Sequence, residues 1–546
     1  MTMRKAVDVL FEVLKDEGVD KIFGNPGSTE MPLMDALVGN TDFSYVLGLQ
    51  EATAVGMADG YAQATGRPSF VNLHTAGGLG NGMGAIISAR ATRTPLVVTA
   101  GQQDTRHLVS EPWLSGNLVS LASPAVKWAA EVNRAADLGP MLRRAFAIAD
   151  THPKGPVFLS IPMDILSAPC EGEAPPRYGR VKEGPAPVDA LAALIAQANG
   201  SSTALLVSDT VARSNAVSEA IQVADAWPCR VFGTPLSACN NFPTEHRAWR
   251  GMLPPDYAEM QQVLAPYETI LYVGDHALLA YPYTDAHPIP LGSTVVQFCQ
   301  DRHYAGFNLP GGQVLAGDLP ATLSALASQL RRTERTADME QLELERADLR
   351  AASAAALESK RGQSPIHCIE AANEVLRLLP KGTRLVNEAS STFEAVRTYA
   401  HFSVDDEYYF VRGGGLGWGM PAAVGIALHD PLRPVACFIG DGASMYSPQA
   451  LWSAASTGAN VKFIIFNNRK YDILMRVAKS LGFPQALASQ FVGMTIDKPA
   501  VDFRALADTF SLPYSSADTI SDLYSAVPLL FEHRGPAVLE VSISGL

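Results

Sequence analysis

The chain has few of the residues that build disulfide frameworks, cysteine metal clusters and nucleic-acid surfaces. Its six cysteines are scattered over 546 residues without a CxxC pair, so we expect neither a cysteine zinc site nor a disulfide scaffold. It has no long basic run, and its formal net charge is −13. Nucleic acid and anionic membranes are therefore unfavourable partners.

Long hydrophobic runs are missing as well. No stretch reaches the roughly 20 apolar residues that a membrane-spanning helix requires. Residues 1–24 carry acids at helical spacing and lack the unbroken apolar segment of a signal peptide. We therefore expect a cytoplasmic protein that does not bind membranes.

Short apolar runs rich in β-formers alternate with amphipathic helical stretches along the chain, and 47% of the residues are hydrophobic. Examples of the apolar runs are residues 95–101, 203–209, 269–275 and 461–468. Continuous apolar strands that alternate with helices predict parallel sheets covered on both faces. The expected fold class is α/β, with several doubly wound parallel-sheet domains.

Two stretches interrupt this alternation and suggest domain boundaries. Residues 167–188 are rich in Pro, Gly and charge, which is typical of a linker. Residues 331–363 are charged and rich in Ala, and predict a solvated helical connector. We expect three domains, at residues 1–166, 187–332 and 360–546.

Polar residues follow two apolar runs in the last third of the chain. One run leads into Gly440–Asp441–Gly442, and the next run ends in Asn467–Asn468. An open parallel sheet binds ligands at the carboxyl ends of its strands. Carboxylate and amide oxygens suit Mg²⁺, and a helix beginning with Ser447 as cap and Pro448 in its first position would favour a diphosphate. The pattern predicts a metal-bridged diphosphate site; a helix cap at Asp441 and a turn at Asn467–Asn468 is the alternative.

The GDG motif, followed after 24 residues by NN, resembles the cofactor-binding motif of the thiamine diphosphate-dependent 2-oxo acid decarboxylases and synthases. The likeness covers essentially the whole chain and is closest to the benzoylformate decarboxylase members. It implies a pyrimidine-binding, a central and a diphosphate-binding domain. The other motifs that carry it are IFGNPGSTEMPL (22–33), LQEATAVGMADGYAQATGRP (49–68), NLHTAGGLGNGMGA (72–85), VTAGQQ (98–103) and GGLGWGMPAAVG (414–425).

The resemblance implies a role for each matching cofactor residue. Asp441, Asn468 and the backbone carbonyl of Lys470 would hold Mg²⁺ or Ca²⁺ on the diphosphate. Glu51 matches the carboxylate that hydrogen-bonds the aminopyrimidine ring, and Leu416 matches the apolar wedge that bends the cofactor. No FAD is expected in the central domain. The expected cofactor-binding set is Glu51, Gly414, Leu416, Asp441, Gly442, Ala443, Ser444, Asn468 and Tyr471.

The residues expected to act on the substrate are Ser28 and His74, which together with Glu51 form the catalytic set that the resemblance implies. Ser28 follows a sharp NPG loop, and His74 ends an apolar strand. The matching decarboxylases carry a second catalytic histidine in the central domain. Here the register from Gly274 puts Tyr281 at that position, and His276 and His287 lie at other offsets, so the second proton donor is left open. The other expected pocket residues are Ile473, Leu474 and Val477.

The implied reaction is non-oxidative decarboxylation of an aryl or branched aliphatic 2-oxo acid to an aldehyde and CO₂, through a ylid and an enamine of the cofactor. The alternative is a carboligase or lyase of the acetolactate synthase or benzaldehyde lyase type, which the missing second histidine favours. A non-catalytic relative would lack a cofactor ligand, yet Glu51, Asp441 and Asn468 are all present. The family also implies a homotetramer, a dimer of dimers with active sites at the dimer interface.

Overall fold

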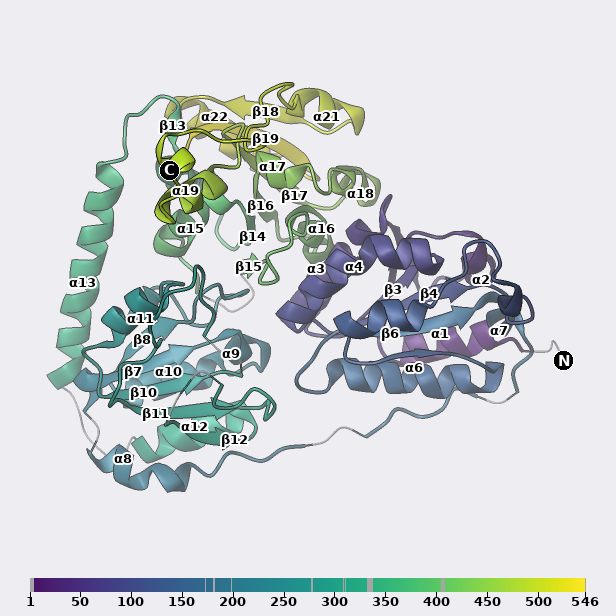
Figure 1. Ribbon diagram of the computed structural model, residues 1–546, viewed down its shortest axis with the longest axis horizontal. Helices are drawn as coiled ribbons and strands as arrows, with labels where there is room; N and C mark the ends of the chain where they lie inside the picture. The colour runs from purple at the N-terminus through teal and green to yellow at the C-terminus, as the bar shows by residue number, and fades with distance from the viewer. Residues whose placement is uncertain are drawn as a thin grey trace. The chain divides into compact units, whose positions relative to one another are not determined.

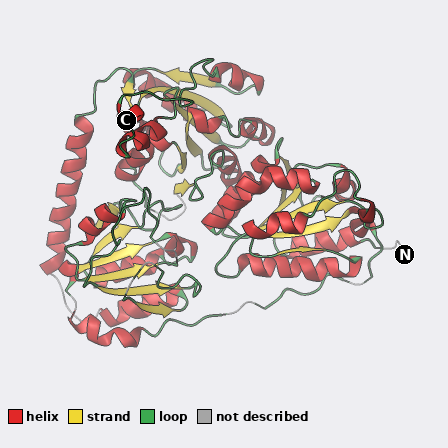
Figure 2. Cartoon of the chain, in the orientation of Figure 1, coloured by secondary structure: helices red, strands yellow, loops and turns green. Residues whose placement is uncertain are grey.

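The computed structural model describes residues 4–545 apart from residues 172, 180–181, 198, 276–277, 308, 310, 331–336 and 404–407 (Figures 1 and 2). It divides into two compact units. The first comprises Met1–Arg180, Leu379–Ser390 and Val411–Gly545, and the second comprises Val181–Leu378 and Ser391–Phe410. The three domain ranges expected from the sequence are not tested by this division and stay predictions.

The first unit contains a parallel sheet built from the N-terminal residues, in the strand order β2-β1-β3-β4-β6-β5. Its central strands are fully buried because helices cover both faces, with α1 and α6 on one side and α3 and α4 on the other (Figure 1). The strands are β1 (Lys21–Gly24), β2 (Ser44–Leu47), β3 (Ser69–Leu73), β4 (Leu96–Gln102), β5 (Ala129–Glu131) and β6 (Val157–Pro162). The helices are α1 (Ala6–Asp16), α2 (Met31–Leu37), α3 (Glu51–Thr65), α4 (Thr75–Thr92), α5 (Leu118–Ala122), α6 (Ala135–Asp150) and α7 (Met163–Ser167).

A second parallel sheet of the first unit comes from the C-terminal residues. Four of its strands follow the order β19-β17-β16-β14, and β18 lies beside β19. The pairing of Gly440 with Phe466 aligns the carboxyl ends of β16 and β17. These strands are β14 (Arg384–Glu388), β16 (Val435–Gly440), β17 (Val461–Asn467), β18 (Tyr514–Ala517) and β19 (Ala537–Ser544). The helices are α16 (Gly419–His429), α17 (Asp441–Ser444), α18 (Gln449–Thr457), α19 (Asp472–Ser480), α20 (Pro484–Leu487), α21 (Phe503–Thr509) and α22 (Ile520–Glu532).

The two halves of the first unit meet where α3 packs against α16. A Cβ atom added to Gly425 of α16 would lie 1.9 Å from the carbonyl oxygen of Met57 on α3. Only glycine therefore permits this close approach of two helix backbones. Beside it, the indole Nε1 of Trp418 donates a 2.7 Å hydrogen bond to the buried carboxylate of Asp59.

The second unit is built on a third parallel sheet, with the order β12-β11-β10-β7-β8-β9. One apolar cluster joins α10 and α12 to one face, and another joins α11 to the opposite face. Three parallel sheets with covering helices confirm the α/β fold class. The strands of this sheet are β7 (Thr203–Val207), β8 (Arg230–Gly233), β9 (Trp249–Met252), β10 (Thr269–Val273), β11 (Thr294–Cys299) and β12 (Gln313–Ala316). The unit also contains the short strands β13 (Ile366–His367) and β15 (Tyr408–Phe410), which do not belong to this sheet. The helices are α8 (Ala192–Gln197), α9 (Asp209–Arg213), α10 (Val217–Ala226), α11 (Tyr257–Leu264), α12 (Leu319–Leu330), α13 (Ala337–Glu358), α14 (Cys368–Leu378) and α15 (Phe393–Tyr399).

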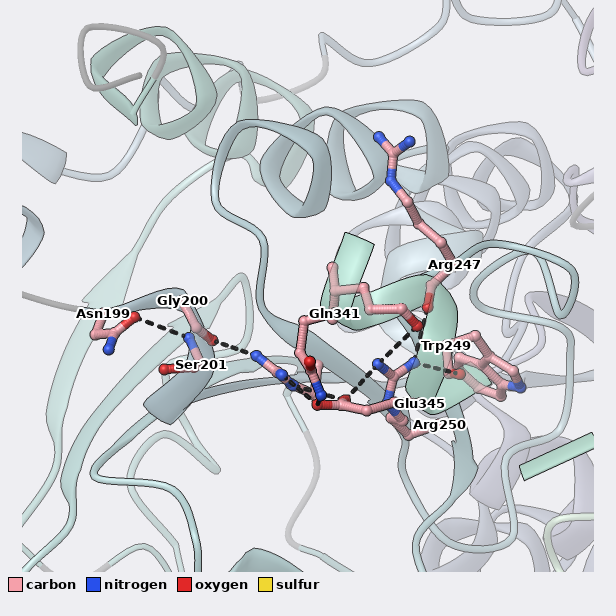
Figure 3. Close-up of polar contacts among 10 residues, drawn as sticks. Asn199, Gly200, Ser201, Arg247, Trp249, Arg250, Gln341 and Glu345 are labelled. Carbon is pink, nitrogen blue, oxygen red and sulfur yellow. Dashed lines mark hydrogen bonds and ion pairs between the residues drawn. The ribbon is translucent and has the colours of Figure 1, made fainter. Parts of the chain in front are cut away.

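Helix α13 covers much of the predicted connector, but it is more than a solvated helix. Its Leu342 is fully buried in the core of the second unit. Its Glu345 accepts hydrogen bonds from Arg230 Nη2 at 2.5 Å and from Arg250 Nη2 at 2.7 Å (Figure 3). Burial acts to raise the pKa of Glu345, but the two guanidinium groups outweigh it and hold that pKa at about 2. One face of the helix is therefore anchored to the β8–β9 edge of the sheet.

The described residues include no helix that is long and apolar enough to cross a membrane.

Candidate active site

His74 lies at the carboxyl end of β3 and is the residue before the first turn of α4. Its ring atom Nδ1 lies 2.8 Å from Glu30 Oε2 and 3.1 Å from Thr29 Oγ1. Glu30 is only 1% exposed, and its carboxylate also accepts hydrogen bonds from the backbone amides of Gly27 and Gly101 at 2.9 Å. A carboxylate at Nδ1 makes that atom the proton donor and directs the other ring nitrogen, Nε2, to a different partner.

Glu30 was not among the site residues predicted from the sequence. It lies 44 positions before His74, and only the pairing of β1 with β3 brings their chain segments together. The sequence did contain one signal for Glu30. It is an acid two residues after the predicted Ser28, in a loop whose sequence already matched the family. Ser28 itself is exposed at the start of the short 3₁₀ turn Ser28–Glu30. Thr75, directly after His74, has a φ of 48°, a strained value for a β-branched residue and a common mark of functional positions.

Glu51 is the first residue of α3, which starts because the side chain of Gln50 accepts a 3.1 Å hydrogen bond from the amide of Thr53. The Glu51 carboxylate accepts a 3.0 Å hydrogen bond from the side chain of Asn81 on α4. The Glu51 side chain is therefore held between two helices in a fixed orientation. Such an orientation suits a group that must present a proton to a bound ring.

The glycine-rich loop before α16 is tied to the carboxyl end of β14 by Glu388. The two carboxylate oxygens accept hydrogen bonds from the backbone amides of Gly417 and Gly419, each at 2.5 Å. Burial raises the pKa of Glu388 to about 7, although these backbone hydrogen bonds act in the opposite direction. The same loop contains Gly414, at a φ of 69°, and Leu416, which is 38% exposed. Glu388 is a second site residue that the sequence analysis missed.

Asp441 lies at the end of β16 and is 4% exposed. Its Oδ2 accepts a 2.7 Å hydrogen bond from the amide of Arg469. Burial raises the pKa of Asp441 to about 6. Backbone hydrogen bonds act to lower this pKa, and the negative charge of Glu540 acts to raise it. The ammonium group of Lys470 pairs with Asp472 at 2.9 Å, and no described side chain forms an ion pair with Asp441. A buried carboxylate without a cation is the environment that a divalent metal would stabilise.

Two asparagines follow at the end of the neighbouring strand, β17. Asn467 is buried, donates to Glu540 at 2.7 Å and accepts from the amide of Arg469 at 3.0 Å. The side-chain oxygen of Asn468 accepts from the amide of Lys470 at 3.1 Å. Among the described residues no cluster of three His, Cys, Asp or Glu side chains could hold a metal. The metal ligands predicted from the sequence would instead combine one carboxylate with amide and backbone carbonyl oxygens.

The prediction that Ser447 caps a helix with Pro448 in its first position is wrong. The chain turns into helix directly at Asp441, and the one-turn α17 ends at Ser444, whose hydroxyl donates to the carbonyl of Asp441 at 2.7 Å. Helix α18 then begins at Gln449, with Pro448 before it, and the hydroxyl of Ser447 makes no capping bond. The local turn after the strand takes the place of the longer helix start that the sequence suggested.

The diphosphate loop predicted at Gly442, Ala443 and Ser444 forms α17 and is almost wholly buried. A Cβ atom at Gly442 would lie 2.6 Å from the ring of Tyr471. This contact brings the predicted Tyr471 beside the loop and explains why glycine is needed there.

The predicted substrate residues fall on separate elements. Ile473, Leu474 and Val477 lie on α19, where Leu474 is 49% exposed. Tyr281 is 60% exposed and belongs to the second unit, so its part in the site stays a prediction. His276 lies outside the described residues.

The structure brings the predicted residues together in groups. His74 contacts Thr29 and Glu30, the two residues after Ser28. Glu51 of α3 is bonded to Asn81 of α4, and Asp441 is bonded to the turn after Asn467. No hydrogen bond or ion pair of the described residues joins Glu51 or His74 to Asp441.

Two family models match the chain at the places where these groups lie. The N-terminal binding domain of the thiamine pyrophosphate enzymes matches residues 4–120, and their C-terminal binding domain matches residues 391–541. The chain belongs to the family of thiamine diphosphate-dependent enzymes.

Individual relatives cover nearly the whole chain. It is 34% identical to the benzoylformate decarboxylase of Pseudomonas aeruginosa, over 99% of each chain. The solved structure of a thiamine diphosphate-dependent 4-hydroxybenzoylformate decarboxylase from Rhodococcus jostii RHA1 superposes with a TM-score of 0.88, at 29% identity and full coverage of both chains. An acetolactate synthase large subunit of Haemophilus influenzae is 25% identical, over 86% of this chain and 83% of its own.

Proposed function

We propose that this protein is a thiamine diphosphate-dependent 2-oxo acid decarboxylase that converts an aryl or branched aliphatic 2-oxo acid to an aldehyde and CO₂. The observation that carries the proposal is the buried Glu30 carboxylate that orients His74, since a fixed imidazole suits a group that positions a substrate carboxylate. The names of the relatives that cover the whole chain support the same reaction.

The cofactor and metal would be held by the residues that end β14, β16 and β17. The side chains of Asp441 and Asn468 and the carbonyl of Lys470 would bind Mg²⁺ or Ca²⁺, and the apolar side chain of Leu416 would contact the cofactor. The buried, unpaired carboxylate of Asp441 fits a divalent ion. When bound, thiamine diphosphate supplies a nucleophilic carbon and an acceptor for the electron pair that CO₂ leaves behind.

The protein's own residues would handle protons and the substrate carboxylate. Glu51 would hold the proton that it shares with the pyrimidine ring. The Nε2 atom of His74 and the hydroxyl of Ser28 would bind the substrate carboxylate, and Glu30 would keep His74 in the tautomer that this binding needs.

The substrate side chain would meet Ile473, Leu474 and Val477 of α19. An aliphatic lining of this kind favours apolar oxo acids, but a difference of one or two methylene groups is worth only ~1–3 kcal/mol. It would therefore tilt the preference between aryl and branched substrates without excluding either.

A carboligase is the second candidate, because the position expected for a second histidine holds Tyr281. Slow protonation would leave time for a second carbonyl compound to react. The match to an acetolactate synthase over most of the chain is consistent with this alternative.

The first test is to incubate the protein with thiamine diphosphate and Mg²⁺ and to measure CO₂, aldehyde and acyloin from benzoylformate, 2-oxoisovalerate and pyruvate. We expect CO₂ and free aldehyde in equal amounts, with benzoylformate or 2-oxoisovalerate preferred. Acyloin in place of aldehyde, or no CO₂, would move the protein to the carboligase and lyase class. Asp441→Ala is the control, since it should release no CO₂ and retain no cofactor.

We also propose a homo-oligomer, a dimer of dimers, in which Glu51 of one chain serves the diphosphate site of another. Two observations support it. No hydrogen bond or ion pair of the described residues joins Glu51 to Asp441. Several large apolar side chains of the C-terminal half are also exposed. These are Leu416, Leu474, Phe483, Leu487 and Val492.

A further inference from the structure

The second unit contains a cavity of about 690 Å³ that the reaction described above does not use. Its walls come from the β9 strand and the loop after it, from α13, and from α14 and α15. Its volume is in the range of sites that bind small organic molecules. The sequence showed no phosphate-binding loop in this region, because the lining residues come from segments far apart in the chain.

Cationic side chains predominate in the walls. The lining arginines are Arg250, Arg346, Arg350, Arg377 and Arg397, and the lining acids are Glu245, Glu259 and Glu394. Glu259 and Glu394 are exposed. In a chain with a net charge of −13, an excess of arginine around one cavity indicates an anionic ligand.

The acids nearby do not balance these arginines. Glu345 is shared by Arg230 and Arg250, so one carboxylate faces two guanidinium groups (Figure 3). Arg397 bonds to the carbonyl of Ser237 and stacks 4.3 Å above the ring of Tyr408, and no described carboxylate pairs with it. Glu374 pairs with Arg377 at 3.1 Å, but Arg397 keeps a positive charge at the cavity that no described carboxylate neutralises.

Glu245 is shared in the same way. It pairs with Arg350 and with His401, and it lies 3.8 Å from Arg346. Burial lowers the pKa of Arg346, and the neighbouring Arg350 adds to that effect while Glu245 opposes it. Removing such a charge from water is costly unless an anion approaches it.

Three of the arginines also have an unused donor. The Nε atoms of Arg250, Arg346 and Arg397 are buried and have no hydrogen-bond partner among the described residues. The side chain of Arg250 is 6% exposed, so water does not readily replace the missing acceptor. Buried N–H groups are almost always bonded in native proteins, so the protein itself satisfies these three guanidinium groups, which line the cavity, only in part.

We propose that this cavity binds a small organic phosphate with an apolar body. A phosphate monoester carries more negative charge and one more terminal oxygen than a carboxylate, and guanidinium groups bind it through strong charge-assisted hydrogen bonds. The apolar body would lie against Pro254, Leu349 and Phe393, which also line the cavity and are not buried. The site is separate from Asp441 and Glu51, both of which belong to the first unit.

The test uses full-length protein saturated with thiamine diphosphate and Mg²⁺, so that the diphosphate site is already occupied. Calorimetric titration with 1-naphthyl phosphate should show binding, and inorganic phosphate and 1-naphthoate should each bind at least about tenfold more weakly. The absence of binding by 1-naphthyl phosphate overturns the proposal, and equal binding of 1-naphthoate overturns the choice of phosphate.

Arginine variants locate the binding. Arg346→Gln and Arg397→Gln should each weaken it by at least about tenfold, because each removes a charge-assisted hydrogen bond. Arg247→Gln is the matched control, since Arg247 is on the same segment as Arg250 but does not line the cavity and pairs with Asp225. Unchanged affinity in both test variants overturns the proposal.

The wild-type protein supplies a second measurement, which does not depend on how the variants fold. Hydrogen exchange should slow on addition of 1-naphthyl phosphate in residues 349–357 and 393–401, which line the cavity. Protection confined to other segments would place the ligand elsewhere and overturn the proposal.

Discussion

At the scale of single residues, the carboxylate of Glu388 holds the backbone of the loop that contains Gly414 and Leu416. In Glu388→Gln an amide NH₂ group would face the backbone amide of Gly417 or Gly419, and two donors repel each other. We expect thiamine diphosphate to bind at least about tenfold more weakly, with the loss of one charge-assisted hydrogen bond. The quenching of tryptophan fluorescence during a cofactor titration measures this affinity.

The same residue predicts a pH dependence of stability. The folded pKa of Glu388 is about 7 and the ordinary value is 4.5, so between these values the folded chain holds a proton that the unfolded chain has released. The free energy of unfolding should therefore fall as the pH rises from 4.5 to 7, by up to ~3 kcal/mol. Urea unfolding of the cofactor-free protein should show this fall, and Glu388→Gln should lack it. Glu532→Gln, at an exposed position, should keep the wild-type profile.

At the scale of elements, the contact of α3 with α16 depends on small residues. The Cβ atom in Gly425→Ala would meet the backbone oxygen of Met57, which cannot turn away as a side chain can. The helices must separate, and we expect a loss of about 1–3 kcal/mol in the free energy of unfolding. Gly84→Ala in α4 is the control: nothing lies within 4 Å of its Cβ position, so it should stabilise the helix by ~0.5–1 kcal/mol. Equal stabilities of the two variants would contradict this account of the contact.

At the scale of the whole molecule, a site shared between chains predicts complementation. Glu51→Ala and Asp441→Ala should each be inactive as pure proteins. If Glu51 of one chain serves Asp441 of another, half of the randomly mixed dimers contain both variants, and each of these has one intact site. Co-refolded mixtures should then recover about a quarter of the wild-type activity. No recovery, with mixed oligomers shown by mass spectrometry, would place both residues in the site of one chain.

The elements were largely predictable, and a cofactor site could be proposed, because their signals are local. Apolar runs marked strands such as β17, and Asp441 and Asn468 follow directly after two of them. Parallel strands then bring their carboxyl ends to one edge, so two short motifs sufficed to predict the site. The exception was the helix start at Ser447, where a short turn at Asp441 competes with the cap and lies within the same few residues.

The α/β class and the family could be derived from the sequence alone, and the cofactor ligands were predicted from it, because strand periodicity and motif spacing are properties of neighbouring residues. Only the tertiary structure decided which acids orient the site. Glu30 meets His74, and Glu388 meets Gly417, through strands that are distant along the chain. The arginines of the cavity likewise come from β9, α13, α14 and α15. The pairing of buried charges depends on which chain segments the sheets bring together. It therefore cannot be predicted from a local sequence pattern.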